Sequence, residues 1–459
     1  MLNKEITIKE IYQKINDDNY QDLDNKEITL KGFVRNNRSL GQVGFMSVND
    51  GSCFLNAQAV YKGDDALLSS IKLGSTVIVK GKIHLTIGGY QPFEIDSSNI
   101  EVISQTEESF PLQKKKTSYD FLRTIPTIRM KSNTFNAVFR VRSVLSYYIH
   151  KYFHDNGYIW VHTPILTAND CEGEGQTFQV VADEKHPEEY FNKDNVHLTV
   201  SGQLHVEPFA LTYGKVYTFG PTFRAEKSNT TRHAAEFWMI EPELAWCDMN
   251  QIMDVEEDFL KYIVKNTREE CYQDFKFFYE RVDKDLEKRL DDFVNKPFKR
   301  LKYEEAIEIL KEASKNHHFD NSDIKFGLDL ASEHERYLTE VHFKCPVFLT
   351  DYPKEIKAFY MKANDDNKTV RGVDLLVPQI GELCGGSERE DNYEKLLARM
   401  NELHMNIPAY EWYLDLRKNG SAPHSGFGLG FERMVMLVTG MTNIRDTLPY
   451  PRTYKDMLY

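Results

Sequence analysis

The stretch Phe219-Gly-Pro-Thr-Phe-Arg-Ala-Glu226 is followed by Arg232-His-Ala-Ala-Glu-Phe237 and, much later, by Gly426-Phe-Gly-Leu-Gly-Phe-Glu-Arg433. The first two stretches supply an arginine that can clamp a phosphate through two hydrogen bonds and an aromatic ring that can stack on a purine. The third supplies another arginine just before the apolar run Met434-Val-Met-Leu-Val438, which predicts a strand that leads into a helix. One such stretch is weak evidence, but the three in this order predict a nucleotide site.

The composition is that of a globular protein. The 459 residues are 41% hydrophobic and 28% charged, which predicts two or three domains with a large core. No apolar run approaches the roughly 18–20 residues that cross a membrane, and the first residues lack the pattern of a secretory signal. The six cysteines are scattered without a CxxC pair, so we expect neither disulfides nor structural zinc, and we expect a cytoplasmic location.

Short strands are predicted between about residues 26 and 104. Hydrophobic residues alternate there with polar ones, and Gly88-Gly89 marks a hairpin turn, a pattern typical of a small barrel. The net charge of −13 argues against indiscriminate binding of nucleic acid, but Phe33 lies between two cations, as on a base-stacking surface. The residues leave open an RNA-binding barrel and a strand-rich accessory domain without a ligand.

The rest of the chain divides into segments of different composition. Residues 105–132 are polar and include Lys114-Lys115-Lys116, so we expect a hinge. Apolar residues at helical spacing predict a long helix from Asn133, which leads into a strand that contains Trp160. Residues 247–345 are rich in predicted helix and carry no visible chemistry, so we expect a structural insertion there.

With Gly157-Tyr-Ile-Trp-Val-His-Thr-Pro164 upstream, the three stretches resemble motifs 1, 2 and 3 of the class II aminoacyl-tRNA synthetases. The resemblance runs from about residue 26 to Pro449-Tyr-Pro-Arg-Thr453 and is closest to the asparaginyl enzymes of class IIb. It implies an α+β fold, with an OB-fold anticodon-binding barrel over 1–104, a hinge over 105–132 and a catalytic domain over 133–459, built on an antiparallel sheet flanked by helices. It also implies a homodimer formed through motif 1. The lack of a long apolar run predicts no attachment to a membrane.

The resemblance assigns ATP-binding roles. Arg224 would hold the α-phosphate and the attacking carboxylate, and Arg433 would lie over the adenine and the γ-phosphate. Glu226 would contact the edge of the adenine ring, and Phe237 would stack on its face. The loop between these residues would reach the terminal phosphates and the acceptor end of tRNA through Lys227, Arg232 and His233.

Magnesium should accompany ATP, and the hard oxygen ligands in the right part of the chain are Asp374 and Glu382. By resemblance, the residues that act in catalysis are Arg224, Arg433 and Glu382. The protein needs no nucleophile of its own, because the amino acid and ATP react with each other.

The amino acid implied by the resemblance is L-asparagine. The residues that would line its pocket are Glu172, Ser201, Gln203, Glu241 and Arg389, of which Arg389 would read the side-chain oxygen. An aspartate site needs two cations, and the aspartyl relatives have a lysine where this chain has Val206. A half-compensated buried carboxylate costs about 3–5 kcal/mol, so Val206 favours asparagine.

The tRNA partner implied is tRNA-Asn, with Arg38, Phe45 and Gln58 at the positions that contact the anticodon bases. Three alternatives stay open at this point: an aspartyl enzyme, with or without misacylation of tRNA-Asn; an ATP-dependent asparagine synthetase descended from the same catalytic domain; and a non-catalytic RNA-binding or regulatory relative. The presence of an anticodon-binding barrel argues against the second, and the retained ATP residues argue against the third.

Overall fold

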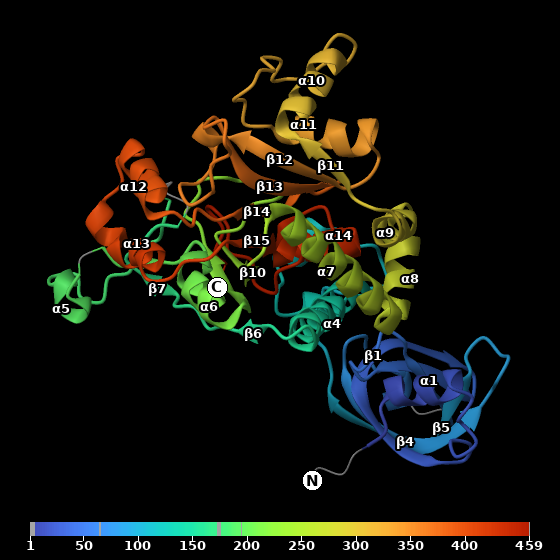
Figure 1. Cartoon of the computed structure of the whole chain (residues 1–459). Helices are drawn as coiled ribbons and strands as arrows, with labels where there is room; N and C mark the ends of the chain where they lie inside the picture. Colours follow the sequence, from blue (N-terminus) through green and yellow to red (C-terminus); the bar gives the residue numbers. More distant parts are fainter. Residues whose placement is uncertain (1–4, 64–65, 172–175, 194, 459) are drawn as a thin grey trace. The chain divides into compact units, whose positions relative to one another are not determined.

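The computed structural model describes residues 5–63, 66–171, 176–193 and 195–458. The chain forms two compact units (Figure 1). One consists of Met1–Arg140 with Tyr272–Phe277, and the other of Val141–Cys271 with Phe278–Tyr459. Among the helices in the described ranges, none combines the length and the apolar character that crossing a bilayer demands.

The first unit is built around a closed five-stranded barrel in the order β1-β2-β3-β5-β4, as the alternating pattern predicted. The barrel strands are β1 (Glu27–Leu40), β2 (Val43–Asn49), β3 (Ala57–Lys62), β4 (Thr76–Leu85) and β5 (Phe93–Ser104). Its helices are α1 (Ile8–Asn16), α2 (Ala66–Ser69) and α3 (Tyr119–Arg123), followed by the 3-10 turn η1 (Arg129–Lys131). Ile8 and Ile11 of α1 join the apolar core of the barrel, so α1 packs on it.

The second unit contains an eight-stranded sheet in the order β11-β12-β13-β14-β15-β10-β9-β6 (Figure 1). Its strands are β6 (Ile159–Trp160), β9 (Lys215–Phe223), β10 (Glu236–Ala245), β11 (Lys299–Lys302), β12 (Val347–Pro353), β13 (Thr369–Val377), β14 (Gly381–Glu388) and β15 (His424–Gly430). The two edge strands run parallel to their neighbours, and all the other pairs are antiparallel. The predicted antiparallel sheet flanked by helices is therefore confirmed.

Helices surround this sheet. The long predicted helix is α4 (Asn133–Asp155); α6 (Gln203–Tyr213), α7 (Met249–Glu270) and α14 (Phe431–Thr439) pack on the sheet strands. The remaining elements are β7 (Leu166–Thr167), β8 (His197–Leu198), α5 (Pro187–Phe191), α8 (Tyr272–Arg281), α9 (Leu286–Asn295), α10 (Tyr303–Ala313), α11 (Ser332–Arg336), the π-helix η2 (Tyr337–His342), η3 (Lys354–Ile356), α12 (Tyr393–Glu402), η4 (Ile407–Tyr410), α13 (Glu411–Lys418) and η5 (Ile444–Asp446).

The predicted insertion is rich in helix, but β11 within it pairs with β12 and so extends the main sheet. The domain boundaries proposed from the sequence at residues 104 and 132 stay predictions. The first compact unit ends at Arg140 and also includes Tyr272–Phe277, the first part of α8.

Candidate active site

Strand β10 organises the site. It pairs with β9 on one side, which places Arg224 directly after β9, and with β15 on the other, which leads into α14 and Arg433. Because side chains alternate along a strand, Phe237, Glu241 and Glu243 share one face of β10. One strand therefore carries residues of both the predicted nucleotide pocket and the predicted amino-acid pocket.

The predicted ATP residues lie together in one small pocket of about 120 Å³. They come from separate parts of the chain and are Arg224, Glu226, Arg232, His233, Phe237, Glu382 and Arg433. The Arg224 guanidinium lies 5.5 Å from the centre of the Phe237 ring. Arg433 Nη1 donates a hydrogen bond to the backbone oxygen of Glu382 at 2.7 Å, which fixes this second guanidinium against β14.

The loop between β9 and β10 is tied to the end of the chain. Arg445 donates to the backbone oxygen of Thr230 at 3.1 Å and to Asn229 Oδ1 at 2.9 Å. The backbone nitrogen of Ala235 donates to the Arg452 carbonyl at 2.7 Å. These contacts hold the loop backbone near Arg232 and His233.

Two carboxylates, Asp374 of β13 and Glu382 of β14, converge over Gly385. A Cβ added at Gly385 would lie 3.3 Å from Asp374 Oδ1 and 3.1 Å from Glu382 Oε1. Burial raises the pKa of Asp374, although the Lys357 ammonium, 2.5 Å from Asp374 Oδ2, opposes this effect. For Glu382, burial is outweighed by three nearby cations, Arg433, Lys357 and Arg224, so its pKa is lowered.

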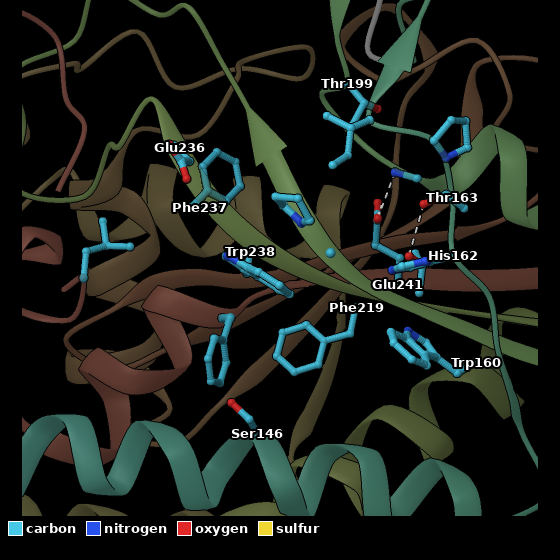
Figure 2. Close-up of a pocket in the computed structure, with 18 of the residues that line it drawn as sticks. Ser146, Trp160, His162, Thr163, Thr199, Phe219, Glu236, Phe237, Trp238 and Glu241 are labelled. Carbon is cyan, nitrogen blue, oxygen red and sulfur yellow. Dashed lines mark hydrogen bonds between the residues drawn. The ribbon is translucent and has the colours of Figure 1, made fainter. Parts of the chain in front are cut away.

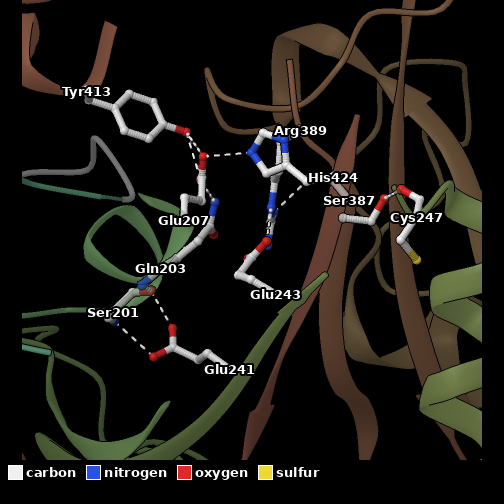
Figure 3. Close-up of polar contacts among 12 residues, drawn as sticks. Ser201, Gln203, Glu207, Glu241, Glu243, Cys247, Ser387, Arg389, Tyr413 and His424 are labelled. Carbon is white, nitrogen blue, oxygen red and sulfur yellow. Dashed lines mark hydrogen bonds and ion pairs between the residues drawn. The ribbon is translucent and has the colours of Figure 1, made fainter. Parts of the chain in front are cut away.

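The predicted amino-acid pocket begins at the start of α6 (Figure 3). Ser201 Oγ donates a hydrogen bond to Glu241 Oε1, and the Gly202 nitrogen donates to Glu241 Oε2 at 2.9 Å. Gln203, the first residue of α6, donates through Nε2 to Glu207 Oε1 at 3.1 Å. Three of the predicted residues therefore meet in one place, whereas Glu172 lies outside the residues that the structure describes.

Arg389 is fully buried and bound to a carboxylate that the sequence analysis did not select. It forms an ion pair with Glu243 and donates through Nη1 to Ser387 Oγ at 2.8 Å. Glu243 lies opposite Gly426, where an added Cβ would stand 2.2 Å from its Oε1. The first glycine of the glycine-rich stretch therefore leaves room for Glu243, and the two-residue spacing from Glu241 was the signal that could have identified it.

A second buried ion network lies beside this pair (Figure 3). Glu207 accepts hydrogen bonds from Arg417 Nη2 at 3.0 Å and from the Tyr413 hydroxyl at 2.7 Å, and His424 Nε2 lies 3.0 Å away. Burial alone would raise the pKa of Glu207, but Arg417 and His424 lower it overall. Both arginines of this region, Arg389 and Arg417, thus already have carboxylate partners.

A larger cavity of about 1360 Å³ is lined by residues of β6, β9 and β10, among others. Figure 2 shows several of its lining side chains. Trp160, Phe219 and Trp238 line it, and Glu241 contributes to its wall. Large apolar side chains in or next to this cavity are exposed, namely Ile159, Trp160, Ile165, Leu166 and Trp238.

The predicted anticodon residues share the outer face of the barrel. Arg38 of β1 pairs in register with Phe45 of β2, and its guanidinium lies 5.1 Å from the ring centre. Gln58 of β3 stands opposite Ser47, two residues from Phe45, and donates to Glu94 Oε1 at 2.7 Å. A cation, an aromatic ring and an amide therefore lie on neighbouring strands.

Comparison with known proteins agrees with this geometry. The family described as tRNA synthetases class II (D, K and N) matches residues 119–454, and the family described as OB-fold nucleic acid binding domain matches residues 28–103. An asparagine–tRNA ligase of Clostridium beijerinckii is 49% identical, with 98% of each chain covered. One from Phocaeicola vulgatus is 51% identical, over 93% of this chain and 94% of the relative.

Among solved structures, the asparaginyl-tRNA synthetase of Pyrococcus horikoshii in complex with asparaginyl-adenylate matches with a TM-score of 0.85. Its identity is 34%, and the match covers 98% of this chain and 99% of that one. The same adenylate complex of the Entamoeba histolytica enzyme matches at 26% identity and a TM-score of 0.81. The chain therefore belongs to the class II tRNA synthetases of the family specific for aspartate, lysine and asparagine.

Proposed function

We propose that the chain ligates L-asparagine to tRNA-Asn in two steps, formation of asparaginyl-adenylate from ATP and transfer to the tRNA 3′ end. The observation that carries this proposal is the buried Arg389–Glu243 pair, because Glu243 lies on β10, the strand that also carries the ATP-pocket residue Phe237. The relatives named asparagine–tRNA ligase, which match over nearly the whole chain, support the same reaction. Asparagine-dependent exchange of pyrophosphate into ATP tests it.

In the first step the amino-acid carboxylate attacks the α-phosphate and pyrophosphate leaves. Arg224 would neutralise charge on the α-phosphate and hold the attacking carboxylate, since a guanidinium binds such oxygens bidentately. Phe237 would stack on the adenine, and Glu226 would contact its edge. Arg433, held by Glu382, would cover the ring from the other side and reach the γ-phosphate, while Arg232 and His233 would meet the terminal phosphates. Positioning and charge stabilisation supply the catalysis.

The site fits Mg²⁺ bound together with ATP. Mg²⁺ usually takes one or two carboxylates and completes its shell with phosphate oxygens and water, and Asp374 and Glu382 offer two carboxylates that face one point. No cluster of three or more His, Cys, Asp or Glu with metal-binding geometry occurs among the described residues, so phosphate oxygens must contribute. When bound, Mg²⁺ would neutralise phosphate charge. Loss of exchange on chelation, restored by excess Mg²⁺, is the expected result.

The pocket favours asparagine because its charges are already balanced. A carboxamide presents one acceptor and one donor, which suit the Arg389 guanidinium and the Glu243 carboxylate respectively. An aspartate carboxylate would meet Arg389, whose charge Glu243 already compensates, and would lie against Glu243 itself. A site built for a neutral polar group therefore rejects the charged isostere, which argues against the aspartyl alternative.

The barrel is proposed to read the anticodon through Arg38, Phe45 and Gln58. We expect Arg38→Ala to reduce charging of tRNA-Asn about tenfold or more, because Arg38 lies against the Phe45 ring and base stacking on such a ring is worth about 1–3 kcal/mol. Asparagine-dependent pyrophosphate exchange should stay unchanged, since that reaction needs no tRNA. The matched control is Lys62→Ala on the exposed end of β3. Equal losses in both reactions of the Arg38 variant would refute this division of labour.

We also propose a cytoplasmic homodimer. The exposed apolar side chains around the large cavity, including Trp160 and Trp238, support a second copy as the partner that covers them. Sedimentation equilibrium at micromolar concentration should give twice the mass of the chain, and a monomeric mass would contradict the dimer.

A further inference from the structure

One short helix of the predicted insertion reaches the ATP pocket. Arg232 Nη1 donates a hydrogen bond to Ser332 Oγ, in the first residue of α11, at 3.2 Å. Glu335, one turn further along α11, lies over the same spot. A Cβ added at Gly381 would stand 2.9 Å from Arg232 Nη1 and 2.6 Å from Glu335 Oε2. The arginine and the carboxylate therefore share the space above the first residue of β14.

Charged residues of the predicted ATP pocket influence the pKa of Glu335. Burial raises the pKa of Glu335 to about 7, and the carboxylates of Glu382 and Asp374 add to this effect. Arg433 and Arg232 act in the opposite direction. Each of these four neighbours has an expected role in binding ATP or Mg²⁺, although Glu335 lies in a segment whose sequence showed no chemistry.

The segment after Glu335 is hydrogen-bonded to the turn between β13 and β14, next to Gly381. Glu340, in the π-helix η2, accepts a hydrogen bond from the backbone nitrogen of Gln379 at 2.9 Å and binds Arg336 through Nε at 3.1 Å. π-Helical turns occur frequently at functional sites. The β13–β14 turn and α11 are thus joined, so Ser332 and Glu335 are presented to Arg232 from a fixed support.

We propose that Ser332 and Glu335 are positioning residues for Arg232. They hold its guanidinium above Gly381 before the nucleotide binds, so that the terminal phosphates of ATP meet an arginine already in place. An arginine side chain that is free to rotate loses much more conformational freedom on binding than one that is held. Arg445 holds the backbone of the loop, whereas Ser332 binds this one side chain directly and the nearby Glu335 carboxylate interacts with its charge across Gly381. The inference rests on the proposed role of Arg232 in binding ATP.

The test compares Glu335→Gln and Ser332→Ala with Glu333→Gln, a control in the same helix. Glu333 accepts hydrogen bonds from the backbone nitrogens of Asp320 and Asn321 rather than facing the pocket. In asparagine-dependent pyrophosphate exchange we expect Glu335→Gln to raise the KM for ATP about tenfold, and Ser332→Ala by a smaller factor. The KM for asparagine and kcat should change less than threefold, and the control should behave as the unmodified protein does.

A double-mutant cycle with Arg232→Ala identifies the residue through which Glu335 acts. If Glu335 positions Arg232, then Glu335→Gln should have no further effect on the KM for ATP once Arg232 is alanine. Fully additive effects, an unchanged KM or a lowered KM in Glu335→Gln would each overturn the inference, the last because it would mean that Glu335 repels ATP. Absence of exchange in the unmodified protein would instead reject the proposed function, so the two failures are distinguishable.

Discussion

Glu243→Gln is expected to lower the preference for asparagine over aspartate, measured as the ratio of kcat/KM values, by about two decades or more. The change leaves the buried Arg389 without its carboxylate partner, a loss worth about 3–5 kcal/mol in a buried pair. A substrate carboxylate can then take the place of Glu243, whereas a carboxamide cannot neutralise the arginine. At 1.36 kcal/mol per decade, even half of that energy shifts the ratio by more than tenfold.

The matched control for Glu243→Gln is Glu388→Gln. Glu388 is also buried and paired with an arginine, Arg371, at 3.0 Å, but that pair lies outside the proposed substrate pocket. Both variants should lose thermal stability, and only Glu243→Gln should change the ratio. If both variants keep the ratio of the unmodified protein, the Arg389–Glu243 pair does not determine specificity.

Val206→Lys, which the sequence comparison suggests as a specificity test, is a less clean experiment. The sequence predicts that it weakens the use of asparagine. In the structure Val206 is fully buried in an apolar cluster with Val161, Ala210 and Val216. An ammonium there would be desolvated, so we expect unfolding to accompany any change in specificity.

Arg224→Ala is expected to reduce asparagine-dependent exchange by about two to three decades, the usual cost of removing one group that stabilises charge in a transition state. Arg224→Lys should recover only a small part of the activity, because an ammonium keeps the charge but not the planar pair of donors. Arg300→Ala, which removes an exposed arginine paired with Asp254, is the control and should be neutral. Full activity in Arg224→Lys would contradict bidentate binding of the α-phosphate and the carboxylate.

The sequence predicts which residues gather around Arg224, Phe237 and Arg433, because these residues lie in local motifs. Arg224 follows a strand and Phe237 lies in the next one, so pairing of these neighbouring strands brings them together. Arg433 arrives through the pairing of β15 with β10, and the glycine-rich stretch was the signal for that strand.

The amino-acid pocket and the helix α11 could be predicted only in part. Glu207 contacts Arg417 and His424, which lie more than two hundred residues later in the sequence. No local sequence pattern predicts such a contact. Glu335 likewise reaches Arg232 only through the fold, from a helix whose sequence reads as an ordinary charged surface. The spacing of Glu241 and Glu243 was a usable signal, because strand alternation places both on one face.

The first measurement is ATP–pyrophosphate exchange without tRNA, with asparagine and aspartate assayed in parallel. Exchange that depends on asparagine and is weaker by at least two decades with aspartate is the expected result, given the balanced charges around Arg389. Equal or faster exchange with aspartate would contradict the proposed specificity while leaving the synthetase reaction intact. Absence of exchange with either amino acid would contradict the proposed reaction itself.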